Sequence, residues 1–231
     1  MSQHYGAKIV RSGLQLLLDA ANTKSYPGTG TTWYDLSGNS NNGTLVNGPT
    51  YSSNNKGYFT FDAADDYITI SASSVIDNLN EFTVSTWIKT GTGTTERGII
   101  SKGPINEFNG ASADGWSLRI RQGVTAFAMR KADNSGYSDI FTGTNIENDT
   151  WCMVTAIFNS SNVLIRYLNT SSEQQTTMGQ SYLKNAHSLK IGVLNSKELN
   201  GELSTVLLYN RALSQAEIQQ NFGAMRGRYG V

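Results

Sequence analysis

The sequence is poor in cysteine and in charge. Its single cysteine, Cys152, stands between Trp151 and Met153 in an apolar run, so no disulfide can form within the chain and a buried, inert thiol is expected. Charged residues make up 16% of the chain, and 18 basic and 18 acidic residues give a formal net charge of +0. This balance provides no electrostatic reason to bind nucleic acid or an anionic membrane. We therefore expect neither of them as a partner.

Long apolar runs and an export signal are also missing. No segment approaches the roughly 20 apolar residues of a membrane span, and the opening MSQHYGAKIVRSG lacks the apolar core of a secretory signal. These features predict a protein that is made and folded in a cytoplasm. In that compartment glycosylation is not expected at the sequons, which lie at Asn42, Asn148, Asn159 and Asn169.

What the chain has in abundance is short alternating stretches joined by turns rich in Gly, Asn, Ser and Thr. The segment FTVSTWIK (82–89) alternates apolar and polar side chains along a strand. WSLRIRQ (116–122) alternates too, which predicts a buried apolar face with Trp116 and a wet polar face with Arg119. Such segments recur along the whole chain and predict antiparallel sheets.

The remaining segments complete an all-β architecture. WCMVTAIFN and VLIRYLN, separated by residues 160–162, predict a hairpin in the middle of a sandwich. Ser214 and Glu217 have the spacing of a capping box, which predicts one short helix over residues 214–222. We therefore predict an antiparallel two-sheet β-sandwich of jelly-roll type with one C-terminal helix. Its core should include Trp87, Val154, Ile165, Ile191 and Leu207.

We expect one domain over residues 13–223, between an N-terminal arm (1–12) and a C-terminal tail (224–231). Chain ends are usually loose unless they are tied down, so both segments could serve as docking arms. Arginine and tyrosine are favoured at interface hot spots. The tail supplies Arg226, Arg228 and Tyr229.

Several ordered motifs resemble the laminin-G-like jelly rolls of the concanavalin A-like lectin and glucanase superfamily. They are GLQLLLDAANTKSYPGTGTTWYDLSGNSNNGTLVNGPTY, FTFDAADDYITI, FTVSTWIK, TWCMVTAIFNSSNVLIRYLN and NGELSTVLLYNRALSQAEIQQNF. The resemblance covers nearly the whole chain and implies a concanavalin A-like sandwich. The lead-in YGAKIV is similar to a subgroup found in virion proteins of tailed bacteriophages.

One polar stretch, TTWYDLSGNSNNGTLVNGPTY (31–51), is interpreted as a long connection that turns repeatedly. Its Asn42-Gly43 and Asn47-Gly48 dipeptides adopt positive φ most easily. Asp35 is expected to accept backbone N–H groups in the LSGN turn. Apolar side chains are expected to pin the loop to the sandwich, namely Trp33, Tyr34 and Leu45.

Because the superfamily includes glucanases, catalytic carboxylates must be considered. A retaining glycosidase needs two carboxylates about 5 Å apart, and laminarinase-type members carry them as E-x-D-x-x-E. The chain contains neither this motif nor a G-x-S-x-G or zinc-ligand spacing. We therefore predict that the protein is not an enzyme and has no catalytic residues.

Calcium is a second candidate, because FDAADDY places Asp62, Asp65 and Asp66 in one turn. Two departures from the family pattern weaken it. Ala63 stands where the family often has Gly, and Ser204 stands where many members have a further Asp. We expect these Asp side chains to cap the turn and expect no metal or cofactor, with calcium kept as the open alternative.

Carbohydrate binding is the non-catalytic role that the resemblance implies, and it needs exposed aromatic rings beside amide and hydroxyl donors. KADNSGYSDIF and FNGASADGW each offer such a combination, although a lone aromatic in a polar loop is more often pinned against the core. The ligand-binding residues therefore remain undetermined. The candidates are Tyr137, Asn134 and Asp139 in the first segment and Phe108, Asn109 and Trp116 in the second.

Two non-catalytic functions follow from this reading. The first is a bacteriophage virion structural protein, most simply a capsid-surface decoration or accessory component that contacts other capsid or tail proteins. The second is a carbohydrate-binding adhesion module of a fibre or host-attachment protein that recognises a cell-surface glycan. We favour the first and prefer decoration to a fibre tip, because the chain has no coiled-coil heptads or β-helical repeat. A homo-oligomer is compatible with either function.

Overall fold

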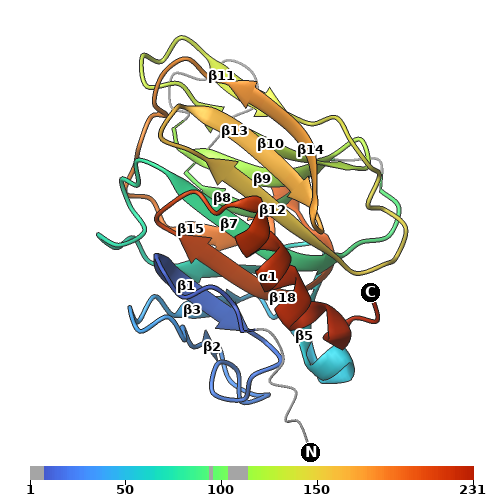
Figure 1. The fold of residues 1–231 in the computed structure, drawn as a ribbon. Coiled ribbons are helices and arrows are strands. Elements are labelled where there is room, and N and C mark those ends of the chain that lie inside the picture. The colour runs from blue at the N-terminus through green and yellow to red at the C-terminus, as the bar shows by residue number, and fades with distance from the viewer. Residues whose placement is uncertain (1–7, 94–95, 104–113) are drawn as a thin grey trace, which may run out of the picture.

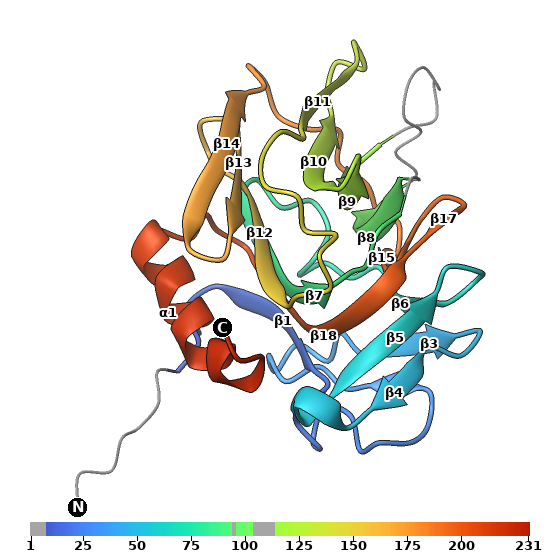
Figure 2. The same ribbon diagram turned by 90° about the vertical axis from the view of Figure 1, so that its right-hand side faces the viewer.

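The computed structural model describes residues 8–93, 96–103 and 114–231. Within these residues the chain forms two 8-stranded antiparallel sheets that pack face to face. A helix covers the outer face of one sheet (Figures 1 and 2). The predicted jelly-roll sandwich with a C-terminal helix is confirmed.

Two large sheets, A and B, make up the sandwich. Sheet A has the order β14 (Ser171–Thr177), β13 (Val163–Leu168), β12 (Cys152–Phe158), β7 (Phe82–Lys89), β18 (Asn200–Tyr209), β5 (Tyr58–Asp62) and β4 (Thr50–Ser52), and β1 (Leu14–Asp19) also pairs with β18. Sheet B has the order β11 (Tyr137–Ile140), β10 (Val124–Arg130), β9 (Trp116–Arg121), β8 (Arg97–Lys102), β15 (Leu189–Ile191), β6 (Tyr67–Ile70), β3 (Gly43–Val46) and β2 (Thr32–Trp33).

Shorter elements lie outside the two sheets. A small hairpin joins β16 (Val193–Leu194) to β17 (Lys197–Glu198), and a 3-10 turn, η1, spans Asn54–Lys56. The helix α1 (Gln215–Met225) continues into a second 3-10 turn, η2 (Arg226–Arg228). No helix in the described part of the chain is long and apolar enough to cross a lipid bilayer.

The main core fills the space between the sheets. Alternation along β7 directs Phe82, Val84 and Ile88 toward sheet B, where they join inward side chains such as Phe127 of β10. Burial of apolar surface on this scale is the main force that holds the sheets together.

A second core lies on the opposite face of sheet A, beneath α1. Trp87 is fully buried there, and its ring stacks on Phe222 at 5.4 Å and on Tyr229 at 4.2 Å between ring centroids. The predicted capping box begins the helix, since the Ser214 side chain accepts from the Glu217 amide and the Glu217 side chain accepts from the Ser214 amide. The helix therefore buries a strip that sheet A would otherwise expose.

Four of the five predicted core residues are buried, and Ile165 is the exception. Trp87, Val154, Ile191 and Leu207 are at most 1% exposed. Ile165 is only half-buried, because β13 is next to the edge strand β14 and turns Ile165 toward the outer face.

The inward positions of β13 go to Leu164 and Arg166 instead. Arg166 is fully buried, and its guanidinium group donates to Thr125 Oγ1 at 2.9 Å and pairs with Glu173 at 3.0 Å. A charged side chain can take an inner position here because these partners replace its contacts with water.

The ends of the described part of the chain are tied down and are not loose. Tyr229 is 8% exposed, and its hydroxyl donates to Ser204 Oγ at 2.8 Å. At the other end, the Val10 amide donates to Asn221 Oδ1 at 2.8 Å. The tail therefore belongs to the core beneath α1, and the segment that enters β1 is tied to the helix.

The polar stretch 31–51 is organised by Asp35, as predicted. Its Oδ1 accepts from the amides of Leu17 at 2.9 Å and Ser37 at 2.8 Å, and its Oδ2 accepts from the Asn41 amide at 3.0 Å. One carboxylate thereby ties the loop to β1.

Two details of the prediction for this stretch are wrong. Tyr34 is 46% exposed and does not pin the loop, because it follows the buried Trp33 and points to the other side. Asn47 and Gly48 do adopt positive φ, but Gly43 lies in β3 with ordinary φ. Gly43 is needed for space, since a Cβ there would lie 2.9 Å from Ile68 Cγ2.

Candidate functional site

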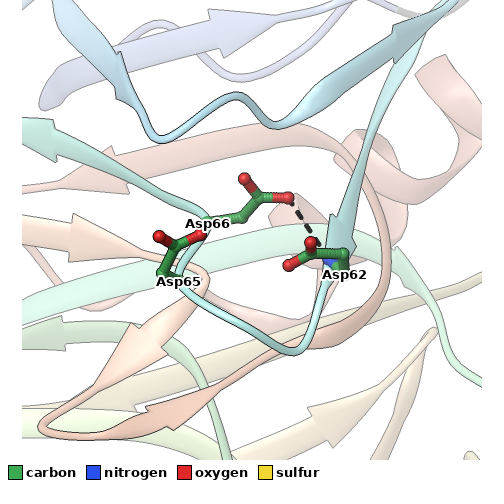
Figure 3. A group of neighbouring side chains, drawn as sticks. All are labelled: Asp62, Asp65 and Asp66. Atoms are coloured by element: carbon green, nitrogen blue, oxygen red, sulfur yellow. Dashed lines mark hydrogen bonds between the residues drawn. The ribbon is translucent and has the colours of Figure 1, made fainter.

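An acidic turn between β5 and β6 carries Asp62, Asp65 and Asp66 (Figure 3). One carboxylate oxygen from each residue lies within 4.8 Å of the others. Asp62 and Asp65 are exposed, whereas Asp66 is buried. Burial, together with repulsion from Asp62, raises the pKa of Asp66 above its ordinary value.

Hydrogen bonds within this turn confirm the predicted capping role. The Asp62 amide donates to Asp66 Oδ2 at 3.3 Å, and the Ala64 amide donates to Asp62 Oδ1 at 2.9 Å. Ser204, which replaces the additional Asp of the family pattern, is buried and donates its hydroxyl to Gly57 O at 2.6 Å. Since calcium takes six to eight oxygen ligands, the three carboxylates would supply only part of a calcium shell.

Trp116 proves to be a core residue and is removed from the candidate sugar contacts. It is 1% exposed, and its ring centroid lies 4.9 Å from that of Phe82. Strand alternation in β9 turns the ring toward sheet A, as the periodicity of WSLRIRQ itself indicates. Phe108 and Asn109, the other candidates of that segment, lie outside the described residues.

The candidates in the first segment, KADNSGYSDIF, are largely committed to internal bonds. Arg130 Nε donates to Asn134 Oδ1 at 2.9 Å, and Asp139 pairs with Arg121 at 2.9 Å. Tyr137 is half-buried on the edge strand β11. The polar side chains of this segment are therefore engaged by bonds within the edge of sheet B, and few of them are available to a ligand.

A chain of charges crosses the outer face of sheet B at β9, where we expected a wet surface. Arg119 is 1% exposed, and it contacts Glu96 Oε1 through Nε at 2.6 Å and Asp139 Oδ2 through Nη2 at 3.1 Å. Lys197 extends the chain by pairing with Glu96 at 2.9 Å. The prediction of a wet Arg119 is wrong, because two carboxylates from other elements compensate its burial.

The outer face of sheet B is organised differently over β6, β15 and β8. Lys190 is paired in register with Thr69 of β6 and with Ser101 of β8, so the three side chains form one row. The residues on either side of Lys190, Leu189 and Ile191, point into the core. A cavity of about 310 Å³ opens beside this row and is lined by Ser101, Gly103, His187, Ser188, Lys190 and Asn195.

This cavity, which we call the sheet B cavity, combines several kinds of hydrogen-bonding group. It presents the exposed Lys190 ammonium group and the side chain of His187, which is 54% exposed and has Nε2 3.4 Å from Asp114 Oδ2. Tyr67 lies on the same face of β6 as Thr69, and Lys190 Nζ is 5.2 Å from the centre of its ring. Ser101 Oγ donates to Val193 O at 2.9 Å, so toward a ligand it is left as an acceptor. A cationic group beside an aromatic ring, with hydroxyl oxygens close by, is suited to a polar ligand with a flat carbon face.

Sequence reasoning missed this cavity. The segment HSLKIG alternates between buried Leu189 and Ile191 and outward Ser188 and Lys190, so periodicity could have assigned Lys190 to the outer face. Periodicity could not have found its neighbours, because β6 and β8 come from distant parts of the chain.

A larger cavity of about 510 Å³ lies at the β17 end of sheet B. Half of its described lining is charged, namely Glu96, Arg97, Lys197 and Glu198. We consider it less suited to a sugar ring than the sheet B cavity, where the lining residue Lys190 contacts the aromatic ring of Tyr67.

The thiol of the single cysteine is buried, as predicted. Cys152 is buried, and its thiol donates to Ile88 O at 3.7 Å. Burial raises the pKa of the thiol to about 12. A group that stays protonated at neutral pH is a poor nucleophile.

Comparison with known families gives one match. The model of the concanavalin A-like lectin/glucanases superfamily (Laminin_G_3) matches residues 61–219. No curated protein matches the sequence.

Solved structures with the same fold include three toxin domains. The binding domain of Paraclostridial Mosquitocidal Protein 1 is 17% identical with a TM-score of 0.73, over 92% of this chain and 52% of that chain. The receptor binding domain of botulinum neurotoxin C/D mosaic serotype is 16% identical with a TM-score of 0.73, over 92% and 51%. The botulinum neurotoxin serotype D ligand binding domain in complex with N-acetylneuraminic acid is 18% identical with a TM-score of 0.70, over 92% and 51%.

The chain spans about half the length of each of these domains. At such low identity the likeness shows the fold alone. The chain thus has a lectin-like binding-domain fold, and its ligand must be argued from its own residues.

Proposed function

The chain belongs to the concanavalin A-like lectin/glucanases superfamily, and from this premise we propose that it is a non-catalytic carbohydrate-binding module. The observation that carries the proposal is the sheet B cavity, whose lining residue Lys190 shares a row with Thr69 and Ser101 and has Nζ 5.2 Å from the ring centre of Tyr67 just outside the cavity lining. Its volume of about 310 Å³ suits one sugar residue of a longer glycan.

The side chains at the sheet B cavity determine which parts of a sugar it can contact. Lys190 and His187 offer donors to sugar hydroxyl or carboxylate oxygens, and Tyr67 offers the side of an aromatic ring to C–H groups of a pyranose. The row is held on three paired strands, so it loses little conformational freedom on binding.

The arrangement of carboxylates supports a non-catalytic role. Glu96 and Asp139 both lie against Arg119 on the outer face of sheet B, with Glu96 Oε1 2.6 Å from Nε and Asp139 Oδ2 3.1 Å from Nη2. This carboxylate pair is therefore engaged by a guanidinium group and is not open to a glycosidic bond. Laminarin, agar, alginate and peptidoglycan should therefore release no product when incubated with the protein.

A glycan array on the purified protein tests the proposal. It should include bacterial surface polysaccharides and sialylated glycans, because a domain of the same fold has been solved with N-acetylneuraminic acid. We expect Lys190→Ala and Tyr67→Ala to weaken the selected glycan at least tenfold, while Lys56→Ala on the distant turn η1 leaves binding unchanged. Equal binding by all variants would move the site elsewhere, and an empty array would contradict the proposed function.

A second candidate function is a virion structural protein of a tailed bacteriophage, such as a capsid-surface decoration. It is supported by the similarity of the YGAKIV lead-in to that subgroup. In this setting the protein is made in the host cytoplasm and resides in the virion, its partners are capsid or tail proteins, and copies of it could associate with one another. The same domain could then present its sheet B cavity to a host glycan, so the two functions are compatible.

Mass spectrometry of purified particles tests this second candidate. The chain should be present at a fixed copy number relative to the capsid protein and should resist removal by washing. Its absence from particles produced in cells that express it would contradict a virion role and would leave carbohydrate binding untouched.

A further inference from the structure

A groove separates the N-terminal segment from the end of α1, and we call it the terminal groove. Its volume is about 290 Å³. Leu17 and Met225, both at most 5% exposed, form its floor, and the half-buried Ile9, Leu36 and Ala224 form its walls. Five carbon-rich side chains make this an apolar recess, in contrast to the sheet B cavity.

The rim of the terminal groove is basic. It carries Lys8, Arg11 and Arg228, and the single described carboxylate in the lining is Asp19. Asp19 pairs with Arg228 at 2.7 Å. Among the lining residues, three positive charges and one negative charge leave an excess of two, held by the exposed Lys8 and Arg11, while the Asp35 carboxylate behind Leu17 is engaged by backbone amides. The groove therefore attracts negatively charged groups.

The walls of the groove are fixed in place. Gln220 Nε2 of α1 donates to Lys8 O at 2.7 Å, and the Leu36 amide donates to Leu17 O at 2.8 Å. Asn221 also holds the Val10 backbone. A groove that is already formed requires little rearrangement when a ligand enters.

The groove itself has the composition of a protein interface. Such interfaces have an apolar centre with a polar rim, and arginine is enriched among their strongest contacts. The terminal groove combines the apolar floor of Leu17 and Met225 with Arg11 and Arg228 at its rim.

We propose that the terminal groove binds an extended segment of a partner protein in which apolar side chains alternate with carboxylates. The apolar side chain enters the recess, and the carboxylates pair with Lys8 and Arg11. The hydroxyl groups of a sugar would find no polar partners on the apolar floor, and a concave recess suits a single side chain better than a flat lipid surface. This inference is independent of glycan binding and goes beyond the proposed function.

The chain's own residues 1–7, which directly precede Lys8 in the sequence, are an alternative occupant. Their sequence, MSQHYGA, contains no Asp or Glu, so it lacks the charge that would complement Lys8 and Arg11. A partner segment therefore fits the rim better than this one.

The test is an NMR titration of the full ¹⁵N-labelled chain with an acetylated and amidated peptide of sequence Leu-Glu-Leu-Glu-Leu-Glu. We expect amide shifts that concentrate at Arg11, Leu36 and Met225 and that weaken as salt rises. The double variant Lys8→Glu, Arg11→Glu should reduce the affinity for the peptide at least tenfold. The control Lys56→Glu changes the net charge by half as much at a distant site and should leave the affinity unchanged. Lys8→Glu alone, at an exposed position, provides an intermediate case if the double variant unfolds.

Four outcomes would overturn the proposal. Equal binding of the peptide Leu-Ser-Leu-Ser-Leu-Ser would remove the role of the carboxylates, and undiminished binding by the Lys8 and Arg11 variants would place the peptide elsewhere. Competition by a synthetic peptide of residues 1–7 would identify the chain's own segment as the occupant. Charge-dependent binding to phosphatidylglycerol vesicles without binding of the acidic peptide would identify a lipid ligand.

Discussion

Trp87 offers the sharpest test of how the helix and tail are attached to the sandwich. The residue is fully buried on the helix side of sheet A, between the rings of Phe222 and Tyr229. Replacement by Ala removes the indole from both contacts and leaves a cavity beneath η2, because neighbouring backbone is fixed by β7.

The expected cost can be estimated from this packing. Truncation of a buried Trp or Phe to Ala costs about 3–5 kcal/mol. Two stacked rings, each contributing about 0.5–1.5 kcal/mol beyond its area, place Trp87→Ala near the upper end. Against a total stability of about 5–15 kcal/mol, the variant should lose a third or more of its free energy of unfolding. In a chain of this size that corresponds to a fall of about 10–20 °C in Tm.

Urea denaturation followed by far-ultraviolet circular dichroism measures this loss. Tyr229→Ala alone and the double variant complete a mutant cycle, and the coupling between the rings should be about 0.5–1.5 kcal/mol. A near-neutral Trp87→Ala would place the ring on the surface. A neutral Tyr229→Ala would show that the tail is loosely attached after all.

Three further changes test separate parts of the fold. Ala63 has φ of 66°, so Ala63→Gly should raise the free energy of unfolding by about 0.5–1 kcal/mol, and a lower urea midpoint would contradict this. A hydrogen bond from Arg211 lowers the pKa of Glu217 to about 2, below its ordinary value of 4.5, so this pair stabilises the fold above about pH 4.5 and its contribution is lost as the pH falls toward 2. Glu217→Gln should flatten that acid-side loss in pH-dependent urea melts, and an unchanged slope would refute the assignment. Asp35→Ala should cost about 2–4 kcal/mol because several donors lose their acceptor, and a cost below about 0.5 kcal/mol would show that the loop does not depend on it.

Local patterns predicted most of the fold. Alternation in FTVSTWIK and the Ser214–Glu217 spacing each depend on neighbours within one element, and both are confirmed. Alternation could also have indicated that Trp33, the last residue of β2, and Tyr34, which follows it, point to opposite sides, so that only one of them is buried.

Features that depend on distant partners were beyond such patterns. Arg119 is buried because Glu96, directly before β8, and Asp139 of β11 approach it, and Tyr229 is buried because it reaches Trp87, 142 positions earlier in the chain. The sheet B cavity has the same origin, since its row joins β6, β15 and β8. In each case the residue type was visible in the sequence but its environment was set by strand order.

The central claim, that the sheet B cavity binds carbohydrate, is tested most directly by an NMR titration with the glycan that the array selects. We predict saturable shifts of the amides of Thr69, Ser101 and Lys190, with weaker binding in Tyr67→Ala. A titration in which the folded protein binds the glycan without moving these amides, or binds no glycan at all, would contradict the claim.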